Sequence, residues 1–232
     1  MTEDAARAAP RIVVRENGPY LVKGGLPLTR AAQVETEYGE PVDWKYGPEF
    51  KSRRTYELCR CGQSSRKPFC DATHETIDWD GSETADREPS ESRREAFAGT
   101  GVVMTDDFVL CTQAGYCGDR FTKVWFMIDD TDDPEVRARL MRMVELCPSG
   151  RLQHMIPPDR EPVEPEFEPS IGVQPDGPYW VRGGVEMFSE DGTPWETRNR
   201  VTLCRCGRSR NKPFCDGSHK LLGFTDPAEP RA

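Results

Sequence analysis

The sequence predicts an α+β protein in which two small β-rich modules flank a small central α+β domain. Residues 59–74 recur as residues 204–219, with 11 of 16 positions identical. Glycine and proline each occur 20 times in 232 residues. Their combined share of about 17%, against an average near 12%, favours short strands and many turns. A single strong helix signal, the capping sequence at residues 133–135, lies between the two copies.

Each copy is expected to begin with a β-hairpin. In the first copy, apolar residues 12–14 and 20–22 flank an Asn-Gly pair at residues 17–18. An Asp-Gly pair at residues 176–177 takes the same place in the second copy. These pairs favour tight hairpin turns, because both turn residues need a positive φ.

A further strand, at residues 55–58 and again at 201–203, is expected to lead into a cysteine-rich loop. The first copy carries 14 extra residues between Gly25 and Cys59. We interpret this insertion as a loop that packs on its own module, with a binding role as the alternative. It contains the aromatic residues Tyr38, Trp44, Tyr46 and Phe50.

Composition places the domain boundaries. A charged, serine-rich linker is expected at residues 81–94, and a Pro/Glu-rich linker at 158–169 that should be extended rather than helical. The predicted domains are therefore residues 10–80, 95–157 and 170–227.

The middle domain is predicted to contain strands at residues 102–104 and 108–110, followed by a helix. Residues 133–134 supply an N-cap Asp and a proline at the first helical position. Apolar residues then recur at helical spacing, and the helix should end at residues 147–148. The residues of this apolar stripe are Val136, Leu140, Met143 and Val144.

Charge and hydropathy exclude several classes of protein. The chain has 31 Lys and Arg against 40 Asp and Glu, a net charge of -9, and without a basic block it is a poor binder of nucleic acid. No apolar run approaches the ~20 residues that a membrane span needs, and Met1–Asp4 begins no export signal. We therefore expect a cytoplasmic protein without membrane contact. Because cytosolic thiols stay reduced, its nine cysteines indicate metal or redox chemistry rather than disulfides.

Both copies contain the spacing C-x-C-x8-C-x3-H. Four soft or borderline ligands are what one zinc ion or one iron–sulfur cluster requires. The C-x-C spacing is narrower than the usual C-x2–4-C of zinc sites, but spacing alone leaves zinc open. The candidate ligands are Cys59, Cys61, Cys70 and His74 in the first copy, and Cys204, Cys206, Cys215 and His219 in the second.

These motifs resemble the CDGSH iron–sulfur domain family. Residues 204–219 meet the family pattern in full, and the first copy departs from it only at Ala72-Thr73. The resemblance implies a [2Fe–2S] cluster in each copy, with the first two cysteines on one iron and the third cysteine and the histidine on the other. It also implies small β-rich domains that pair around two clusters, here as an intrachain pseudo-dimer.

An imidazole ligand has two physical consequences. A cluster with three thiolates and one neutral imidazole carries one negative charge less than a four-cysteine cluster, so it accepts an electron more readily. An imidazole that leaves iron can also be protonated, so cluster retention should weaken as the pH falls.

Two kinds of residue recur beside the ligands in both copies. Lys67 and Lys212, each just before Pro-Phe-Cys, are candidates for pairing with the clusters, with surface lysines as the alternative. Asp71 and Asp216 follow the third cysteine, where we expect them to cap the short turn that carries the histidine. Proton handling beside the histidine is the alternative role for these aspartates.

Three further cysteines, Cys111, Cys117 and Cys147, lie in the middle domain. When they are aligned with the ferredoxin pattern C-x2-C-x2-C and a distant Cys-Pro, Ala114 occupies the position of the middle ligand. A [3Fe–4S] cluster is expected, with a [4Fe–4S] cluster or three structural cysteines as alternatives. The stretch is similar to the divergent single-cluster ferredoxins, although Gln113 stands where that group often has histidine.

The remaining histidine, His154, has no partner at ligand spacing and is interpreted as a surface or core residue.

The favoured function is a one-electron carrier with two [2Fe–2S] clusters and one [3Fe–4S] cluster, rather than a stand-alone catalyst. Cluster transfer or redox and pH sensing is the second hypothesis, and a zinc-bearing scaffold is the third. The expected partner of the carrier is a reductase or oxidase, and the protein itself could be a monomer.

Overall fold

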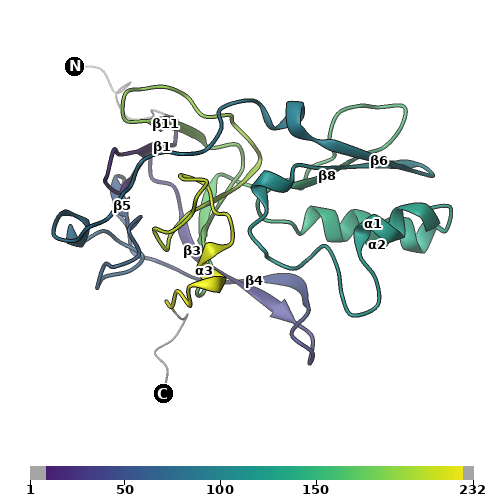
Figure 1. The fold of residues 1–232 in the computed structure, drawn as a ribbon, viewed down its shortest axis with the longest axis horizontal. Coiled ribbons are helices and arrows are strands. Elements are labelled where there is room, and N and C mark those ends of the chain that lie inside the picture. The colour runs from purple at the N-terminus through teal and green to yellow at the C-terminus, as the bar shows by residue number, and fades with distance from the viewer. Residues whose placement is uncertain (1–8, 227–232) are drawn as a thin grey trace.

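The computed structural model describes residues 9–226, so the start of the chain and residue 227, the last of the third predicted domain, lie outside the described residues. Three small sheets and a few short helices make up an α+β fold, as predicted (Figure 1). The first sheet has the order β11 (Glu186–Ser189), β1 (Arg11–Val14), β2 (Tyr20–Lys23), β5 (Tyr56–Leu58). The second has the order β12 (Arg200–Leu203), β10 (Tyr179–Arg182), β9 (Ser170–Val173), β3 (Leu28–Glu35), β4 (Pro41–Glu49). The third has the order β6 (Glu95–Gly99), β7 (Val102–Asp106), β8 (Leu152–Met155).

The two repeat copies exchange equivalent strands. Both predicted hairpins form, β1 with β2 and β9 with β10. The strand that follows each hairpin then leaves its own copy: β3 pairs in parallel with β9, and β11 pairs in parallel with β1. The copies therefore form one intrachain pseudo-dimer, in which neither sheet belongs to one copy alone.

One hydrophobic core is built from buried residues of both exchanged sheets and both copies. The hairpin residues that alternate inward along β1 and β2 meet their counterparts on β9 and β10. Equivalent pairs in this core are Ile12 with Ile171, Tyr20 with Tyr179, and Leu58 with Leu203. This shared core places the loops that follow β5 and β12 next to each other.

The central domain packs the sheet of β6, β7 and β8 against two helices, α1 (Val124–Met127) and α2 (Pro134–Glu145). The cap of α2 is confirmed, because the Asp133 carboxylate accepts a 2.8 Å hydrogen bond from the Glu135 N–H. Leu140 and Val144 on the predicted stripe are buried against the sheet. No helix of the described residues is long and apolar enough to cross a membrane.

The strand predicted at residues 108–110 is wrong, because this segment is a 3-10 helix. The N–H groups of Leu110 and Cys111 turn back to the carbonyls of Asp107 and Phe108. Phe108 is consequently 73% exposed, and the turn directs the chain toward the first central cysteine. The remaining short helices are 3-10 helices at Thr73–Glu75, Ser90–Arg93, Phe108–Leu110 and Ile128–Asp130, and α3 at Ser218–Leu221.

The insertion of the first copy was predicted to pack on its own module, and this is wrong in part. Its residues form β4, which pairs with β3 and then reaches the other two domains. The Trp44 ring lies 4.5 Å from Trp180 of the second copy and 5.1 Å from Tyr116 of the central domain. The Trp44 indole also donates to the Leu146 carbonyl at 3.1 Å. β4 therefore docks the central domain onto the pseudo-dimer.

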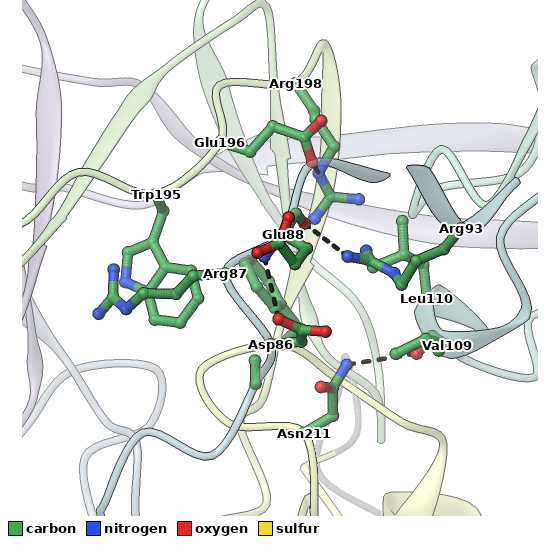
Figure 2. A pocket seen from close by; sticks show the side chains of 12 residues that line it. Asp86, Arg87, Glu88, Arg93, Val109, Leu110, Trp195, Glu196, Arg198 and Asn211 are labelled. Atoms are coloured by element: carbon green, nitrogen blue, oxygen red, sulfur yellow. Dashed lines mark hydrogen bonds and ion pairs between the residues drawn. The ribbon is translucent and has the colours of Figure 1, made fainter. Parts of the chain in front are cut away.

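The first predicted linker, residues 81–94, packs against the second copy. Figure 2 shows its Arg87 and Glu88 beside Trp195 and Arg198. The Arg87 guanidinium lies 3.8 Å from the centre of the Trp195 ring. The cavity enclosed there has a volume of only about 20 Å³, room for about one water. This junction holds the domains together and has no space for a larger ligand.

Candidate metal centres

The first set of Cys/His residues, here called the N-terminal site, lies in the loop after β5. Cys59 and Cys61 follow the end of the strand, with their sulfur atoms 3.8 Å apart. Cys70 and His74 lie further along the loop, and the Cys70 Sγ is 3.4 Å from the His74 Nδ1. The four donors therefore form two close pairs.

The second set, here called the C-terminal site, repeats this arrangement after β12. The sulfur atoms of Cys204 and Cys206 are 3.8 Å apart, and the Cys215 Sγ is 3.3 Å from the His219 Nδ1. His219 lies on α3, which also gives the second site the same order of elements as the first.

These distances test whether the donors fit a metal group. Two thiolates bound to one tetrahedral ion lie about 3.8 Å apart, given metal–sulfur bonds of about 2.3 Å. Each pair thus matches the ligands of a single metal atom. Across the described residues, however, no three His, Cys, Asp or Glu side chains converge where one ion could hold them all. The donors at each site therefore suit a bound metal group, and the number of metal atoms in it stays a prediction.

The local environment favours a neutral imidazole, and it supplies hydrogen-bond donors to thiols that burial keeps protonated in the absence of a metal. Burial raises the pKa of the Cys70 and Cys215 thiols, so a metal has to displace the proton. Backbone N–H groups of Ala72 and Gly217 point at these sulfur atoms, both at 3.4 Å. Burial also lowers the pKa of His219 to about 4, which leaves its ring neutral and able to bind iron at neutral pH.

The two sites differ in burial. In the C-terminal site, Cys215 is 3% exposed and His219 5% exposed. In the N-terminal site, Cys70 is half-buried and the His74 side chain is 12% exposed. The N-terminal site is therefore the more exposed of the two.

The two lysines that precede Pro-Phe-Cys are held within the ligand loops. The Lys67 ammonium donates to the Ser64 carbonyl at 2.8 Å, and the Lys212 ammonium donates to the Ser209 carbonyl at 2.9 Å. Lys212 is only 9% exposed. Both positive charges thus lie beside the sites, and a direct interaction with bound clusters stays a prediction.

The aspartates after the third cysteine organise the turn that carries the histidine. Asp71 accepts hydrogen bonds from the Thr73 N–H and hydroxyl, which, with further bonds from Ser65, lower the pKa of its carboxyl. Asp216 accepts from the Ser218 N–H at 2.9 Å. The aspartates bind the turn as predicted, but each lies one residue before the N-cap position, which is Ala72 or Gly217.

The two ligand loops lie back to back. A Cβ built on Gly62 would come within 2.6 Å of the Cys206 carbonyl oxygen, and one on Gly207 within 2.5 Å of the Cys61 carbonyl oxygen. Only glycine allows this approach. Trp79 bridges the same contact, because its indole donates to the Gly207 carbonyl at 3.1 Å while its ring lies 6.3 Å from the His74 ring.

The three middle cysteines form the central site. Cys111 follows the 3-10 helix at residues 108–110, Cys117 lies in the loop before α1, and Cys147 lies just after α2. The structure brings them to one cavity of about 260 Å³, with Ala114 also in its lining. A single water takes about 30 Å³, so the cavity has room for a multi-iron group.

The central site also contacts the C-terminal site. The Lys220 ammonium on α3 donates to the Gln113 carbonyl at 2.6 Å. The Gln113 side chain fills the space above Gly217, where a Cβ would lie 2.8 Å from its Cγ. His219 and Thr112 line a common hollow of about 430 Å³. The sequence offered no signal for this contact, because it depends on how the domains dock.

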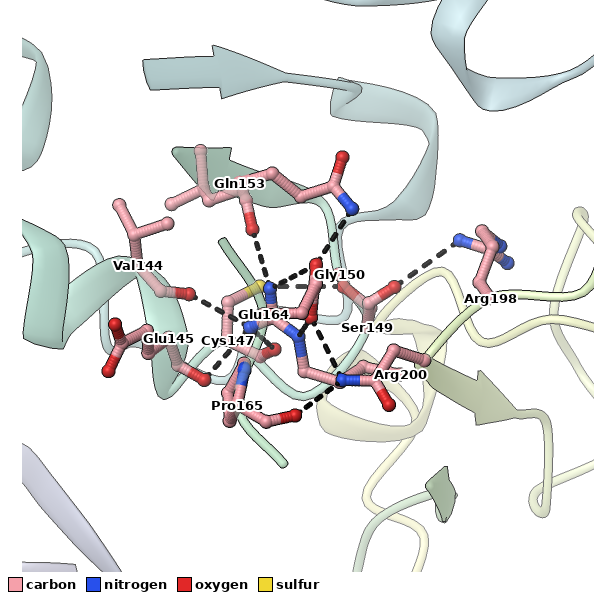
Figure 3. A network of polar contacts seen from close by, with 12 residues as sticks. Val144, Glu145, Cys147, Ser149, Gly150, Gln153, Glu164, Pro165, Arg198 and Arg200 are labelled. Carbon is pink, nitrogen blue, oxygen red and sulfur yellow. Dashed lines mark hydrogen bonds and ion pairs between the residues drawn. The ribbon is translucent and has the colours of Figure 1, made fainter. Parts of the chain in front are cut away.

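Arg200 of β12 fixes the loop of the third central cysteine. Figure 3 shows its guanidinium surrounded by backbone carbonyls at the C-terminal end of α2. It donates to the Cys147 carbonyl at 2.8 Å and pairs with the Glu164 carboxylate at 2.7 Å. Its side chain is completely buried. An arginine from the pseudo-dimer therefore holds part of the central site, which sequence analysis missed.

Comparison with known families agrees with this geometry. The model of the family described as iron-binding zinc finger CDGSH type matches residues 17–75 and 176–220. The model of the divergent 4Fe-4S mono-cluster family matches residues 97–156. The chain carries two CDGSH-type domains around a divergent 4Fe-4S mono-cluster domain. No curated protein matches this chain.

The chain is thus an iron–sulfur protein in which two CDGSH-type matches flank a mono-cluster match. The CDGSH-type domains contain the N-terminal and C-terminal sites, and the mono-cluster domain contains the central site. All nine cysteines are free and belong to one of the three sites. The ligand role of each of them, and of His74 and His219, stays a prediction that individual substitutions can test.

His154, by contrast, belongs to none of the sites. Its ring is fully buried in β8 and neither ring nitrogen has a hydrogen-bond partner.

Proposed function

We propose that this iron–sulfur protein is a one-electron carrier with three centres. The N-terminal and C-terminal sites would each hold a [2Fe–2S] cluster on three cysteines and one histidine. The central site would hold a [3Fe–4S] cluster on three cysteines, with [4Fe–4S] as the alternative. When bound, each cluster accepts and returns a single electron.

The observation that carries this proposal is the packing of the three sites in series. The close contacts at Gly62 and Gly207 place the loop of the N-terminal site directly against that of the C-terminal site. Gln113 of the central site packs directly against Gly217. An electron carrier with several centres needs such contacts, whereas a scaffold with independent zinc sites does not.

The protein's own residues would hold and tune the clusters. Backbone N–H groups donate to the cysteine sulfur atoms, which stabilises negative charge at the sites. The buried arginine Arg200 keeps the Cys147 loop in place.

Metal and sulfide analysis of the purified protein tests the proposal first. We expect a coloured protein with iron and acid-labile sulfide near ratios of one to one in the CDGSH-type domains. A colourless protein with stoichiometric zinc would exclude the carrier function and support the scaffold.

EPR spectroscopy before and after reduction tests the central site. An oxidised [3Fe–4S] signal is expected, and the Cys111→Ser variant should lose it while keeping the signals of the reduced [2Fe–2S] sites. Thr112→Ser, in the same loop, is the matched control and should keep all signals. A central signal that survives in Cys111→Ser would contradict the assigned ligand.

Cluster donation is the second candidate function, favoured by the exposure of one site. Cys70 and His74 are partly exposed, so an acceptor protein can reach them. Incubation with an apo-ferredoxin separates the two functions. Transfer of intact clusters faster than electron exchange with a reductase would favour the donor, and the reverse order would favour the carrier.

The same proposal includes a partner and a location. With a net charge of -9, the carrier would dock on a basic face of a reductase or oxidase. Thiolate ligands need a reducing compartment, so we place it in the cytoplasm. Pull-down with the reduced protein, compared at low and high salt, would identify the partner and test the electrostatic attraction.

A further inference from the structure

Each CDGSH-type domain buries an arginine between its first two ligand cysteines. These are Arg60 in the N-terminal site and Arg205 in the C-terminal site, and both are 1% exposed. A guanidinium stays charged in proteins. Two positive charges are therefore buried at equivalent places beside the two sites.

Arg205 has a carboxylate partner. Its guanidinium forms an ion pair with Asp226, whose carboxylate also lies 3.9 Å from the Arg30 guanidinium. It also donates to the carbonyls of Gly177 and Gln174, both at 2.7 Å. Every nitrogen of this guanidinium has a partner.

The charge of Arg60 has no such partner. Its Nη1 donates to the Arg15 carbonyl at 2.9 Å, but its Nε and Nη2 are buried without a hydrogen bond. Among residues 9–226 no carboxylate forms an ion pair with it. Asp80 is within electrostatic range, but this carboxylate is exposed to solvent and screened. The guanidinium lies instead over the rings of Tyr20 and Trp79, 5.6 Å from each centroid.

One substitution between the repeats accounts for the difference. Counted from the ligand histidine, Trp79 corresponds to Phe224 and Gly81 to Asp226. Arg205 lies over Phe224 as Arg60 lies over Trp79. The first copy thus keeps the aromatic contact and lacks the carboxylate. A side chain at residue 81 has no room either, because a Cβ there would lie 2.6 Å from the Trp79 ring.

Two further differences act in the same direction. The C-terminal site is more deeply buried, and burial disfavours the added negative charge of a reduced cluster. It also lies near the central site. Burial is the larger effect that disfavours negative charge on Cys215, and the nearby Cys111 acts in the same direction. An uncompensated positive charge in a low-dielectric environment, by contrast, stabilises added negative charge.

We propose that Arg60 makes the N-terminal site the stronger electron acceptor of the two CDGSH-type sites. This inference rests on the proposed carrier function and gives it a direction. One electron from a one-electron donor enters at the central or C-terminal site and passes to the N-terminal site. No bond forms or breaks; the C-terminal site is oxidised as the N-terminal site is reduced. The electron then leaves at the more exposed site.

Potentiometry followed by EPR tests this on the full-length protein with its clusters. Cys70→Ser and Cys215→Ser, which each remove one site, assign the two [2Fe–2S] signals. In the wild-type protein the N-terminal signal is expected to develop at the higher potential. Arg60→Gln should shift the equilibrium between the two sites at least tenfold toward the C-terminal site, equivalent to about 59 mV for one electron.

Two variants serve as controls. Arg60→Lys keeps the charge and should keep most of the difference. Asp226→Asn removes the carboxylate from the other arginine, so it should raise the potential of the C-terminal site and leave the N-terminal one unchanged. If Arg60→Gln fails to fold, Asp226→Asn still tests whether the carboxylate partner of the buried arginine sets the potential of its site.

Equal potentials in the wild type, or a lower potential at the N-terminal site, would overturn the inference. So would unchanged potentials in a folded Arg60→Gln variant or, where that variant does not fold, in Asp226→Asn. These outcomes leave the carrier proposal standing. The absence of any iron–sulfur signal would instead overturn the proposed function itself.

Discussion

Tyr20 and Tyr179 meet edge to face at the centre of the pseudo-dimer, with ring centroids 6.0 Å apart and ring planes at 89°. Each tyrosine donates a hydrogen bond to the ligand loop of the opposite copy. The Tyr20 hydroxyl donates to the Cys204 carbonyl at 2.8 Å, and the Tyr179 hydroxyl donates to the Cys59 carbonyl at 2.9 Å. Burial raises the pKa of both phenols well above the usual value, so both keep their proton. The two ligand loops are therefore held crosswise.

The crossed hydrogen bonds predict a crossed effect of mutation. Tyr20→Phe leaves the buried Cys204 carbonyl without this donor, which should cost about 1–3 kcal/mol. Hydrogen exchange should accelerate at the Cys204 N–H and stay unchanged at the Cys59 N–H. Tyr179→Phe is the matched control and should reverse the pattern. Faster exchange in the loop of the mutated copy itself would contradict the arrangement.

Removal of Arg200 should destabilise the central site from outside its domain. Arg200→Met deletes the donor to the Cys147 carbonyl and leaves the Glu164 carboxylate without its partner. Loss of one member of a buried ion pair costs about 3–5 kcal/mol. Urea unfolding followed by circular dichroism should show this loss, and iron should leave the central site before the other two.

An exposed ion pair between the same domains provides the control for Arg200→Met. Arg142 and Asp43 are paired at 2.8 Å, but their side chains are 56% and 55% exposed. Arg142→Gln should therefore change the free energy of unfolding by less than about 1 kcal/mol. An equal loss in both variants would mean that burial does not decide the strength of these contacts.

Trp44→Ala should loosen the central domain from the pseudo-dimer. The indole is 9% exposed and lies against Trp180 and Tyr116. Truncation of a buried tryptophan costs about 3–5 kcal/mol, and hydrogen exchange should increase in α2. Tyr38→Ala, at a 63% exposed position of the same insertion, should stay within about 0.5 kcal/mol of the wild type.

Local signals in the sequence predicted the elements that depend on local interactions. The hairpins form at the predicted turn pairs, residues 17–18 and 176–177, and Asn17 and Asp176 have a positive φ. The expected positive φ at the glycine of each pair is wrong. The cap at Asp133 is likewise a contact within three residues. The two Cys/His sites could be found because all their donors lie within one short loop.

Contacts between distant segments could not be predicted in this way. β3 and β11 each pair with the hairpin of the other copy. Because the two hairpins are equivalent, the sequence of each strand is the same whether it pairs within its own copy or with the other one. Arg200 and Trp44 look like ordinary strand residues until the domains are docked. The 3-10 helix at residues 108–110 was mistaken for a strand because three apolar residues in a row fit either element.

Ala72→Gly should stabilise the protein. Ala72 has a φ of 65°, where Gly217 stands in the other copy with a φ of 84°. This left-handed conformation costs a residue with a Cβ roughly 1–2 kcal/mol, and the unfolded-state entropy of glycine offsets about half of the gain. Thermal unfolding should show a gain of about 0.5–1 kcal/mol.

The reverse substitution in the other copy is the control. Gly217→Ala should destabilise the protein by more than Ala72→Gly gains, because its Cβ would also meet the Gln113 side chain at 2.8 Å. A loss of stability in Ala72→Gly would show that the turn does not carry the expected strain.

His154 should make the protein less stable as the pH falls below about 7. Burial lowers the pKa of its ring from the usual value of 6.5. Glu145 and Glu164 raise this pKa in part and Arg200 lowers it further. The unfolded state therefore binds the proton first, so stability is complete above pH 6.5 and falls as the pH drops below it, by at most about 1.4 kcal/mol per pH unit.

The comparison with His154→Leu isolates this contribution. Both ring nitrogens are buried without a hydrogen bond, so an apolar side chain of similar size is tolerated and removes the ionisable group. Urea unfolding of both proteins at about pH 7.5 and about pH 5.5 should give a larger loss of stability in the wild type. Because both proteins keep His74 and His219, any acid lability of the metal sites cancels in the difference. Identical pH dependence in the two proteins would mean that folding does not shift the pKa of His154, and it would contradict this prediction.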